Sequence, residues 1–186
     1  MVRLLLALAA TVSQGTAQRP ADVVMIMKAP PRALEVLTFT DPANRFSVEY
    51  PKKDWRLSAG GLSVLVSFTQ KDGEARVDIE HAPQRRRLDP ASIGDLFLSV
   101  QAEEIKEIDR LAADIKSRLI TNGDTRIAVF EYTRQGGDGP EYARVYLFLR
   151  GLSLYRVVCR VKSAQLAKYN PVFAHIAATF AAKEIT

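Results

Sequence analysis

Few side chains in this sequence could perform catalysis or hold a metal ion. The chain of 186 residues has two histidines, His81 and His175, and a single cysteine, Cys159. Neither histidine is followed by a second histidine or a glutamate at a spacing that would place two metal ligands on one helix face. The sequence therefore predicts no metal site, and nothing in it indicates a cofactor.

No motif indicates a nucleophile either. The sequence contains no Gly-x-Ser-x-Gly segment, the strand-to-helix turn that exposes a catalytic serine in many hydrolases. The glycine-rich segment 136–140 connects two expected strands and opens no helix, so we interpret it as a hairpin loop and not as a phosphate loop. Glu103 and Glu104 point about 100° apart on a helix and suit its solvated side. We expect no catalytic residues and no enzymatic activity.

Positively charged and aromatic side chains remain as candidates for binding a partner. The stretch FSVEYPKKDW, residues 46–55, combines a strand pattern with a proline, two lysines and the only tryptophan of the chain. A run of three arginines after an expected strand is the densest positive cluster, although a solvated loop also explains it. The candidate partner-binding residues are Lys52, Lys53, Trp55, Arg85, Arg86 and Arg87.

A second basic set lies in the strands expected over 141–150 and 153–161. Arginines alternate there with aromatic residues on what could be one sheet face, which would suit an anionic partner or a stacked aromatic ligand. Alternatively, the arginine stems cover apolar sheet and reach acids on an overlying helix. The set consists of Arg144, Arg150, Arg156 and Arg160 with Tyr142, Tyr146 and Phe148.

The N-terminus is typical of a secretory signal peptide. Arg3 precedes the apolar run 4–12, and the small residues Gly15 and Ala17 suit cleavage after position 17. A run of nine apolar residues is too short to span a bilayer, which needs about 20 residues. We therefore expect residues 1–17 to be removed, leaving a periplasmic or secreted protein with no transmembrane segment.

The composition suits one soluble globular domain. Hydrophobic residues make up 47% and charged residues 25% of the chain, close to the average for such proteins. The net charge of +5 is modest, and a nucleic-acid partner is not expected. Pro30 and Pro31 exclude a helix or central strand, so we assign 18–42 to a lead-in or arm. Its apolar segment 23–27 has no clear role, and 43–186 forms the domain.

Periodicity predicts the elements of the first half. Residues 46–50 alternate apolar and polar side chains as in a half-buried strand, which Pro51 ends. The alternating segments 62–68 and 77–79 form a hairpin across Asp72-Gly73, a pair that tolerates positive φ.

A long helix follows. Asp89 and Pro90 mark the start of a helix expected over 90–108, because proline at the first helical position loses no hydrogen bond. Apolar residues then recur every three or four positions, and we expect this stripe to lie on the sheet. The stripe consists of Ile93, Leu96, Phe97, Val100, Ile108 and Leu111.

The second half reads as a meander of four antiparallel strands. Asn122-Gly123 is a strong hairpin signal, residues 136–140 form a loose glycine turn, and the strands 141–150 and 153–161 are joined near Gly151. Large residues on both sides of these two strands indicate that both faces of the sheet are covered.

A closing helix opens at Pro171. Its apolar stripe contains Val172, Ile176 and Phe180, with Phe173 and Ala177 beside them. The predicted fold is α+β, an antiparallel β-sheet with helices packed on both faces, or an α/β/α sandwich.

Cys159 has no partner for an intramolecular disulfide. In an oxidising compartment a lone thiol is buried, paired with another chain, or reactive. It shares the apolar side of its strand with Tyr155, Val157 and Val161, so we expect it to be buried.

The order of these elements resembles the PsbP-like family. The segments that carry the resemblance are FSVEYPKKDW, the hairpin across Asp72-Gly73, DLFLSV, YLFLRGLSLYRVVCRV and YNPVFAHIAATF, within about residues 40–182. That family is named for an extrinsic lumenal protein of photosystem II, and its fold is shared with a Ran-binding nuclear import factor and with bacterial exported proteins. The resemblance implies an antiparallel sheet between helices and a non-enzymatic accessory role, with no catalytic residues to carry over.

Three functions follow from the sequence. An exported, non-catalytic accessory or binding protein with a protein partner in the cell envelope is favoured, and the signal peptide fits a bacterial exported member. The alternative is a small-molecule or lipid carrier, which would need an apolar cavity lined by Tyr146, Phe148 and Val158. A secreted hydrolase built from scattered residues is the third. The ligand, the pathway and the oligomeric state stay open.

Overall fold

The computed structural model describes residues 34–61, 63–87, 89–122 and 125–183. The predicted signal peptide and the apolar segment 23–27 lie outside the described residues. The strands are β1 (Val36–Thr40), β2 (Phe46–Pro51), β3 (Trp55–Ala59), β4 (Val64–Gln70), β5 (Ala75–Pro83), β6 (Ala112–Asn122), β7 (Thr125–Gly136), β8 (Gly139–Arg150), β9 (Ser153–Lys162) and β10 (Ala181–Ala182). The α-helices are α1 (Asp95–Ile108) and α2 (Leu166–Thr179), preceded by the short 3-10 helices η1 (Pro90–Ser92) and η2 (Ser163–Gln165).

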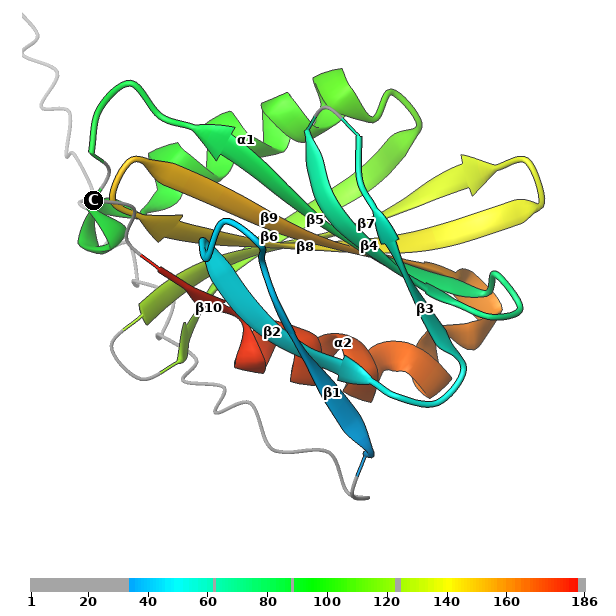
Figure 1. The fold of residues 1–186 in the computed structure, drawn as a ribbon. Coiled ribbons are helices and arrows are strands. Elements are labelled where there is room, and N and C mark those ends of the chain that lie inside the picture. Colours follow the sequence, from blue (N-terminus) through cyan, green and yellow to red (C-terminus); the bar gives the residue numbers. More distant parts are fainter. Residues whose placement is uncertain (1–33, 62, 88, 123–124, 184–186) are drawn as a thin grey trace, which may run out of the picture.

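The strands form two antiparallel sheets (Figure 1). A large sheet has the order β3-β4-β5-β9-β8-β7-β6, and a small one has the order β1-β2-β10. The strand predicted over 46–50 is confirmed as β2, but it belongs to the small sheet. β1 lies within the expected lead-in 18–42 and pairs with β2 from Val36 opposite Pro51 to Thr40 opposite Ser47.

Tight turns build the predicted meander, which is confirmed as β6 to β9. Asn122 pairs with Thr125 across the first hairpin, as the Asn-Gly signal predicts. Gly136 pairs with Gly139, so the expected loose loop is a two-residue turn. Gly139 has a φ of +111°, a conformation that favours glycine. The hairpin of β4 and β5 is also confirmed, with Gly73 at a φ of +74°.

Helix α1 begins later than predicted. Asp89 accepts a hydrogen bond of 2.9 Å from the Ala91 N–H and caps η1, as the sequence signal indicates. The extended backbone of Gly94 then separates η1 from α1. The segment predicted as one helix therefore consists of a 3-10 turn and a shorter α-helix.

The buried face of α1 differs from the predicted stripe. Leu98, Gln101 and Ile105 are the buried residues of the helix. Four residues of the predicted stripe are instead exposed: Leu96 (81%), Val100 (56%), Ile108 (62%) and Leu111 (52%). Ile93 of the stripe is buried, and Phe97 is partly buried against the same cluster. For the other four residues the prediction is wrong, because apolar side chains occur on several sides of this helix and spacing alone permits more than one inward face.

Helix α2 contains Pro171 in its interior and begins at Leu166, so the prediction that Pro171 opens the helix is wrong. Its apolar face is largely as expected, because Phe173, Ile176 and Ala177 are buried.

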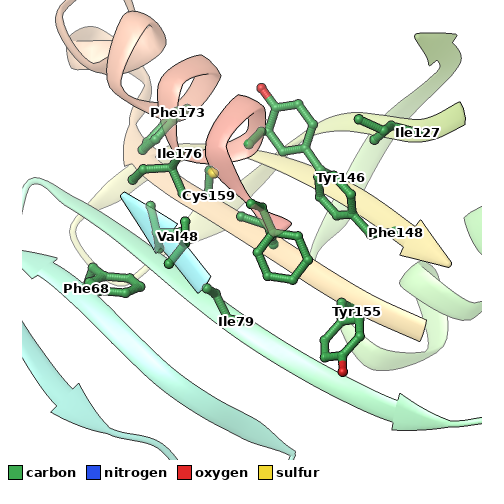
Figure 2. Close-up of a cluster of buried hydrophobic side chains, with 14 of the residues drawn as sticks. Val48, Phe68, Ile79, Ile127, Tyr146, Phe148, Tyr155, Cys159, Phe173 and Ile176 are labelled. Carbon is green, nitrogen blue, oxygen red and sulfur yellow. The ribbon is translucent and has the colours of Figure 1, made fainter. Parts of the chain in front are cut away.

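Buried side chains form one apolar cluster on each face of the central strands. In Figure 2, Tyr146, Phe148, Tyr155 and Cys159 of the large sheet lie beside Phe173 and Ile176 of α2 and Val48 of β2. The other cluster joins Leu98 and Ile105 of α1 to Val145, Leu147, Leu154 and Val158. Cys159 is fully buried, as predicted, and burial raises the pKa of its thiol.

The fold is α+β and mostly antiparallel sheet, as predicted. A helical layer over both faces is not established. Among the described residues, α1 packs on one face of the large sheet and α2 on the other, and the small sheet shares the side of α2 (Figure 1). On the side of α1, the face formed by β3, β4 and β5 carries polar side chains, and Arg56, Ser58 and Arg76 are exposed there.

Candidate functional site

Lys52, Lys53 and Trp55 lie at the connection between β2 and β3. Both lysines are exposed, and the Lys52 N–H donates a 2.9 Å hydrogen bond to the Glu35 carbonyl. Trp55 is half-buried, and its ring meets Tyr169 of α2 edge-on at 6.2 Å. The tryptophan therefore packs against α2, whereas the two lysines are available to a partner.

Arg85, Arg86 and Arg87 lie at the other end of β5. All three are exposed, and the Gln84 N–H donates a 2.8 Å hydrogen bond to the Leu152 carbonyl in the turn between β8 and β9. Trp55 pairs with Gln70 beside the turn that precedes β5. The nine residues of β5 therefore separate the two predicted groups by roughly 25 Å, and the structure does not bring them together.

The second basic set is divided between the two faces of the sheet. Arg144 lies opposite Cys159 on the α2 face, and its Nε lies 2.7 Å from Glu131 Oε1. Arg156 and Arg160 pair with Leu147 and Ala143 on the α1 face. The prediction of one shared face is wrong. Each even-numbered residue of β8 pairs with an odd-numbered residue of β9, so even-numbered residues of the two strands point to opposite faces of the sheet.

A buried carboxylate organises the charged part of the α1 face. Asp78 of β5 is 2% exposed. Its Oδ1 accepts from Ser67 Oγ at 2.6 Å and from Arg76 Nε at 2.7 Å, and its Oδ2 accepts from Arg160 Nη1 at 2.9 Å. A charged residue at every second position of β5 was the available sequence signal for this polar face. The pairing of β5 with β9, which brings Arg160 to Asp78, could not be predicted from the spacing of residues in the sequence.

Further ion pairs connect this face to α1. Arg156 of β9 pairs with Glu104 of α1. At the end of the helix, Asp109 Oδ2 lies 3.1 Å from Arg134 Nη1. Glu80 lies half-buried between them, and burial raises the pKa of its carboxyl against the opposing charges of Arg156 and Arg160. The hollow between these groups has a volume of about 30 Å³, room for roughly one or two waters, so we assign them to packing and not to ligand binding.

The outward side of α1 presents a row that we call the outer row: Leu96, Val100, Glu103 and Glu107. At 100° per residue these four positions lie within about 60° of one another, opposite the buried face of the helix. All four are exposed, and Glu103 Oε1 accepts a 2.7 Å hydrogen bond from Lys106 Nζ. Sequence reasoning missed this row because it assigned Leu96 and Val100 to the core.

One serine and one histidine meet in a way that could suggest hydrolysis. His81 Nε2 lies 3.0 Å from Ser153 Oγ, but Ser153 is buried. Burial, followed by the charge of Arg45, lowers the pKa of His81. Within the described ranges, no carboxylate is hydrogen-bonded to the ring to orient it as a catalytic base. His175 Nε2 lies 2.9 Å from Glu49 Oε2. No group of three potential metal ligands occurs in the described part of the chain.

The cavity expected for a carrier is not formed. Tyr146 and Phe148 lie on the α2 face, whereas Val158 pairs with Val145 on the α1 face. Three residues on opposite faces cannot line one cavity. Phe148 does line a hollow of about 380 Å³ with Phe180, next to the hairpin of β6 and β7. No helix of the described residues is long and apolar enough to cross a membrane.

Comparisons with known proteins identify the fold. No family model matches the chain, and no curated protein matches its sequence. Cyanobacterial PsbP (CyanoP) from Synechocystis sp. PCC 6803 matches with a TM-score of 0.62 and 11% identity, over 84% of this chain and 97% of that protein. The chain therefore has a PsbP-like fold, as the resemblance predicts.

Two other solved structures share this fold. LpqN of Mycobacterium tuberculosis, described as involved in cell envelope biogenesis, matches with a TM-score of 0.54 and 8% identity, over 81% of this chain and 91% of that protein. A protein from Bacteroides thetaiotaomicron matches with a TM-score of 0.55 and 19% identity, over 79% of this chain and 48% of its own. At sequence identities this low, the similarity shows a shared fold.

Proposed function

We propose that this protein is an exported, non-catalytic accessory protein that binds a protein partner of the cell envelope through the outer row of α1. The observation that carries the proposal is the exposure of Leu96 and Val100 on the same side of α1 as Glu103 and Glu107. Exposed apolar side chains that cluster and are bordered by charges are characteristic of protein interaction sites.

The chemistry of the outer row defines the partner. Leu96 and Val100, four residues apart, form the apolar half of the row. Glu103 and Glu107, also four residues apart, form its negatively charged half. A helix of this kind binds in an apolar groove of another protein. We infer a groove with a lysine or arginine rim, because opposite charges select the partner and speed its association.

The fold and the N-terminal sequence support the accessory role. LpqN, which shares the fold, is described as involved in cell envelope biogenesis, and residues 1–17 have the features of a signal peptide. The part-buried His81–Ser153 pair lacks an orienting carboxylate among the described residues, which argues against the hydrolase.

A carrier function is the second candidate, and the hollow beside Phe148 and Phe180 favours it. Its volume of about 380 Å³ falls within the range of small-molecule sites. Mass spectrometry of the native protein, purified from its own envelope, tests this function. A bound lipid or small molecule, lost in a Phe148→Ala variant, is the expected result for a carrier.

The accessory function is tested by capture from the native envelope. The bait is the exported protein, and the variant is Leu96→Lys with Val100→Lys, which removes apolar contact and opposes a basic rim. The matched control is Leu37→Lys with Leu57→Lys, because these leucines of β1 and β3 are also exposed. We expect one protein to be recovered with the wild type and the control, and to be lost with the α1 variant.

Two results would contradict this function. Equal recovery by the α1 variant and the control would show that the outer row does not bind the partner. A concentration-dependent dimer that light scattering detects in the wild type, and not in the α1 variant, would identify the row as a contact between two copies of this chain. Circular dichroism of each variant ensures that loss of binding is compared between folded proteins.

A further inference from the structure

A cleft at one end of the large sheet is lined by four positively charged side chains. Arg76 of β5, Arg134 of β7, and Arg160 and Lys162 of β9 line an opening of about 410 Å³. It lies where the turn between β4 and β5 approaches the strands β7 to β9, away from the outer row of α1. Volumes of this size suit a small molecule.

Two of these arginines face one another with one carboxylate between them. Arg76 and Arg160 are direct partners across β5 and β9, and like charges in this position are unfavourable. Asp78 offsets the repulsion by binding Arg76 Nε at 2.7 Å and Arg160 Nη1 at 2.9 Å. Two guanidinium groups therefore share a single negative charge, and the cleft keeps an excess of positive charge on this side.

The other acidic groups near the cleft offset this excess only in part. Asp78, Asp109 and Glu141 supply three negative charges against the four positive charges of the cleft, so one positive charge remains. The Glu74 carboxylate accepts hydrogen bonds from Lys168 Nζ at 2.8 Å and Tyr169 Oη at 2.9 Å, so it is held by α2. Glu141 Oε2 lies 3.6 Å from Arg134 Nε, an ion pair that is too long for a hydrogen bond. Lys162 lies opposite Glu141 in the β8–β9 ladder.

Two arginines that line the cleft each have a buried donor without a hydrogen bond. Within the described part of the chain, Nε of Arg134 and Nε of Arg160 make no hydrogen bond although they are inaccessible at the surface. A buried donor without an acceptor costs roughly 1–3 kcal/mol, so such groups call for an explanation. Both guanidinium groups are held by a carboxylate through Nη1, to Asp109 and to Asp78 respectively. Their orientation is thereby fixed.

We propose that this cleft binds an oxyanion, the phosphate or carboxylate group of a small molecule, with Arg134, Arg160 and Lys162 as its ligands. A guanidinium that is anchored by one carboxylate presents its accessible Nη N–H groups to a second acceptor in a fixed geometry, and charge-assisted bonds of this kind are the strong ones. Lys162 supplies a mobile positive charge at the mouth of the cleft, where it is exposed.

The binding is tested by NMR titration of the arginine Nε–Hε signals with inorganic phosphate and, separately, with succinate. We expect saturable shifts of the Arg134 and Arg160 signals. Saturation with phosphate alone, succinate alone or both would support the site and identify the group that it prefers. No saturation by either anion up to about 50 mM, a limit of very weak affinity, would overturn the proposal.

Variants with opposite expected effects separate binding from folding. Arg160→Gln should weaken the affinity by about ten-fold or more, the effect of losing one charge-assisted hydrogen bond. Glu141→Gln should strengthen it by roughly two- to five-fold, because it removes a nearby negative charge. A misfolded protein cannot show this gain.

The matched control is Arg150→Gln, which lowers the net charge equally. Arg150 is exposed near the other end of β8, nine residues or roughly 30 Å from Glu141. We expect the affinity of the Arg150→Gln variant for phosphate to equal that of the wild type. Equal weakening by Arg150→Gln and Arg160→Gln, with no gain in Glu141→Gln, would show that the anion responds to overall charge and would contradict a built site.

Discussion

The phenol of Tyr132 donates a 3.3 Å hydrogen bond to Oδ2 of Asp109 and so joins β7 to the residue that ends α1. Both residues are buried. A negative charge at a helix C-terminus is unfavourable because the helix dipole has its negative end there. Arg134, 3.1 Å from the same oxygen, offsets that charge. The three groups together hold the C-terminal end of α1 on the sheet.

Tyr132→Phe should therefore lower the free energy of unfolding. The variant leaves the buried Asp109 oxygen with one partner fewer, which costs about 1–2 kcal/mol. Urea denaturation followed by circular dichroism measures this loss. Tyr50→Phe is the matched control, because no hydrogen bond to the Tyr50 hydroxyl occurs among the described residues. Equal midpoints for the two variants would contradict a stabilising role of the Tyr132–Asp109 bond.

The stability of the protein should fall at alkaline pH. Burial, then the charge of Asp109, raises the pKa of Tyr132 to about 12, and burial raises the pKa of Tyr146 to about 12 as well. An unfolded tyrosine ionises near pH 10. Above that pH the unfolded state loses phenol protons that the folded state keeps, so the free energy of unfolding decreases between about pH 10 and 12.

Absorbance at 295 nm provides the measurement for this effect. In the native protein, two of the six tyrosines of the chain should ionise only near pH 12, or together with unfolding. Tyr146→Phe should remove one late step. Ionisation of all six residues near pH 10 with the fold intact would show that Tyr132 and Tyr146 are accessible to solvent and would refute the expectation.

A pair of leucines tests the inward face of α1. Leu98 is buried and Leu96 is 81% exposed. Leu98→Ala should lower the free energy of unfolding by about 2–3 kcal/mol, because it leaves a cavity under the helix. Leu96→Ala should change it by less than about 0.5 kcal/mol, as surface substitutions do. Thermal and urea unfolding compare the two variants. A larger loss of stability in Leu96→Ala than in Leu98→Ala would support the inward face that was predicted from spacing.

Local signals in the sequence were sufficient for some of the strands and hairpins, whereas β1, β3 and β10 were not predicted. The alternation in 46–50 and the Asp72-Gly73 and Asn122-Gly123 turns depend on neighbouring residues, and β2, the β4–β5 hairpin and the β6–β7 hairpin follow from them. The inward face of α1 could not be found in this way. Leu96, Phe97 and Leu98 are consecutive, so any choice of face leaves an apolar residue outside.

The candidate site depended on pairing between strands. Arg144 and Arg156 lie on opposite faces because Arg150 pairs with Ser153 across a two-residue turn that begins at Gly151. One additional residue in that turn would have placed them on the same face. Asp78 and Arg160 belong to β5 and β9, which are adjacent in the sheet but distant in the sequence. No local pattern indicates that pairing.

Cys159 should react with thiol reagents only when the protein opens. The side chain is fully buried, between Val77 of β5 and Arg144 of β8, its partners across the sheet. Burial raises the pKa of the thiol, and the thiolate is the reactive form. In native buffer we expect labelling by DTNB at the rate of unfolding, and fast labelling in 6 M guanidinium, roughly the condition that unfolds stable domains. Rapid labelling in native buffer would show that β9 is open to solvent on the α2 face.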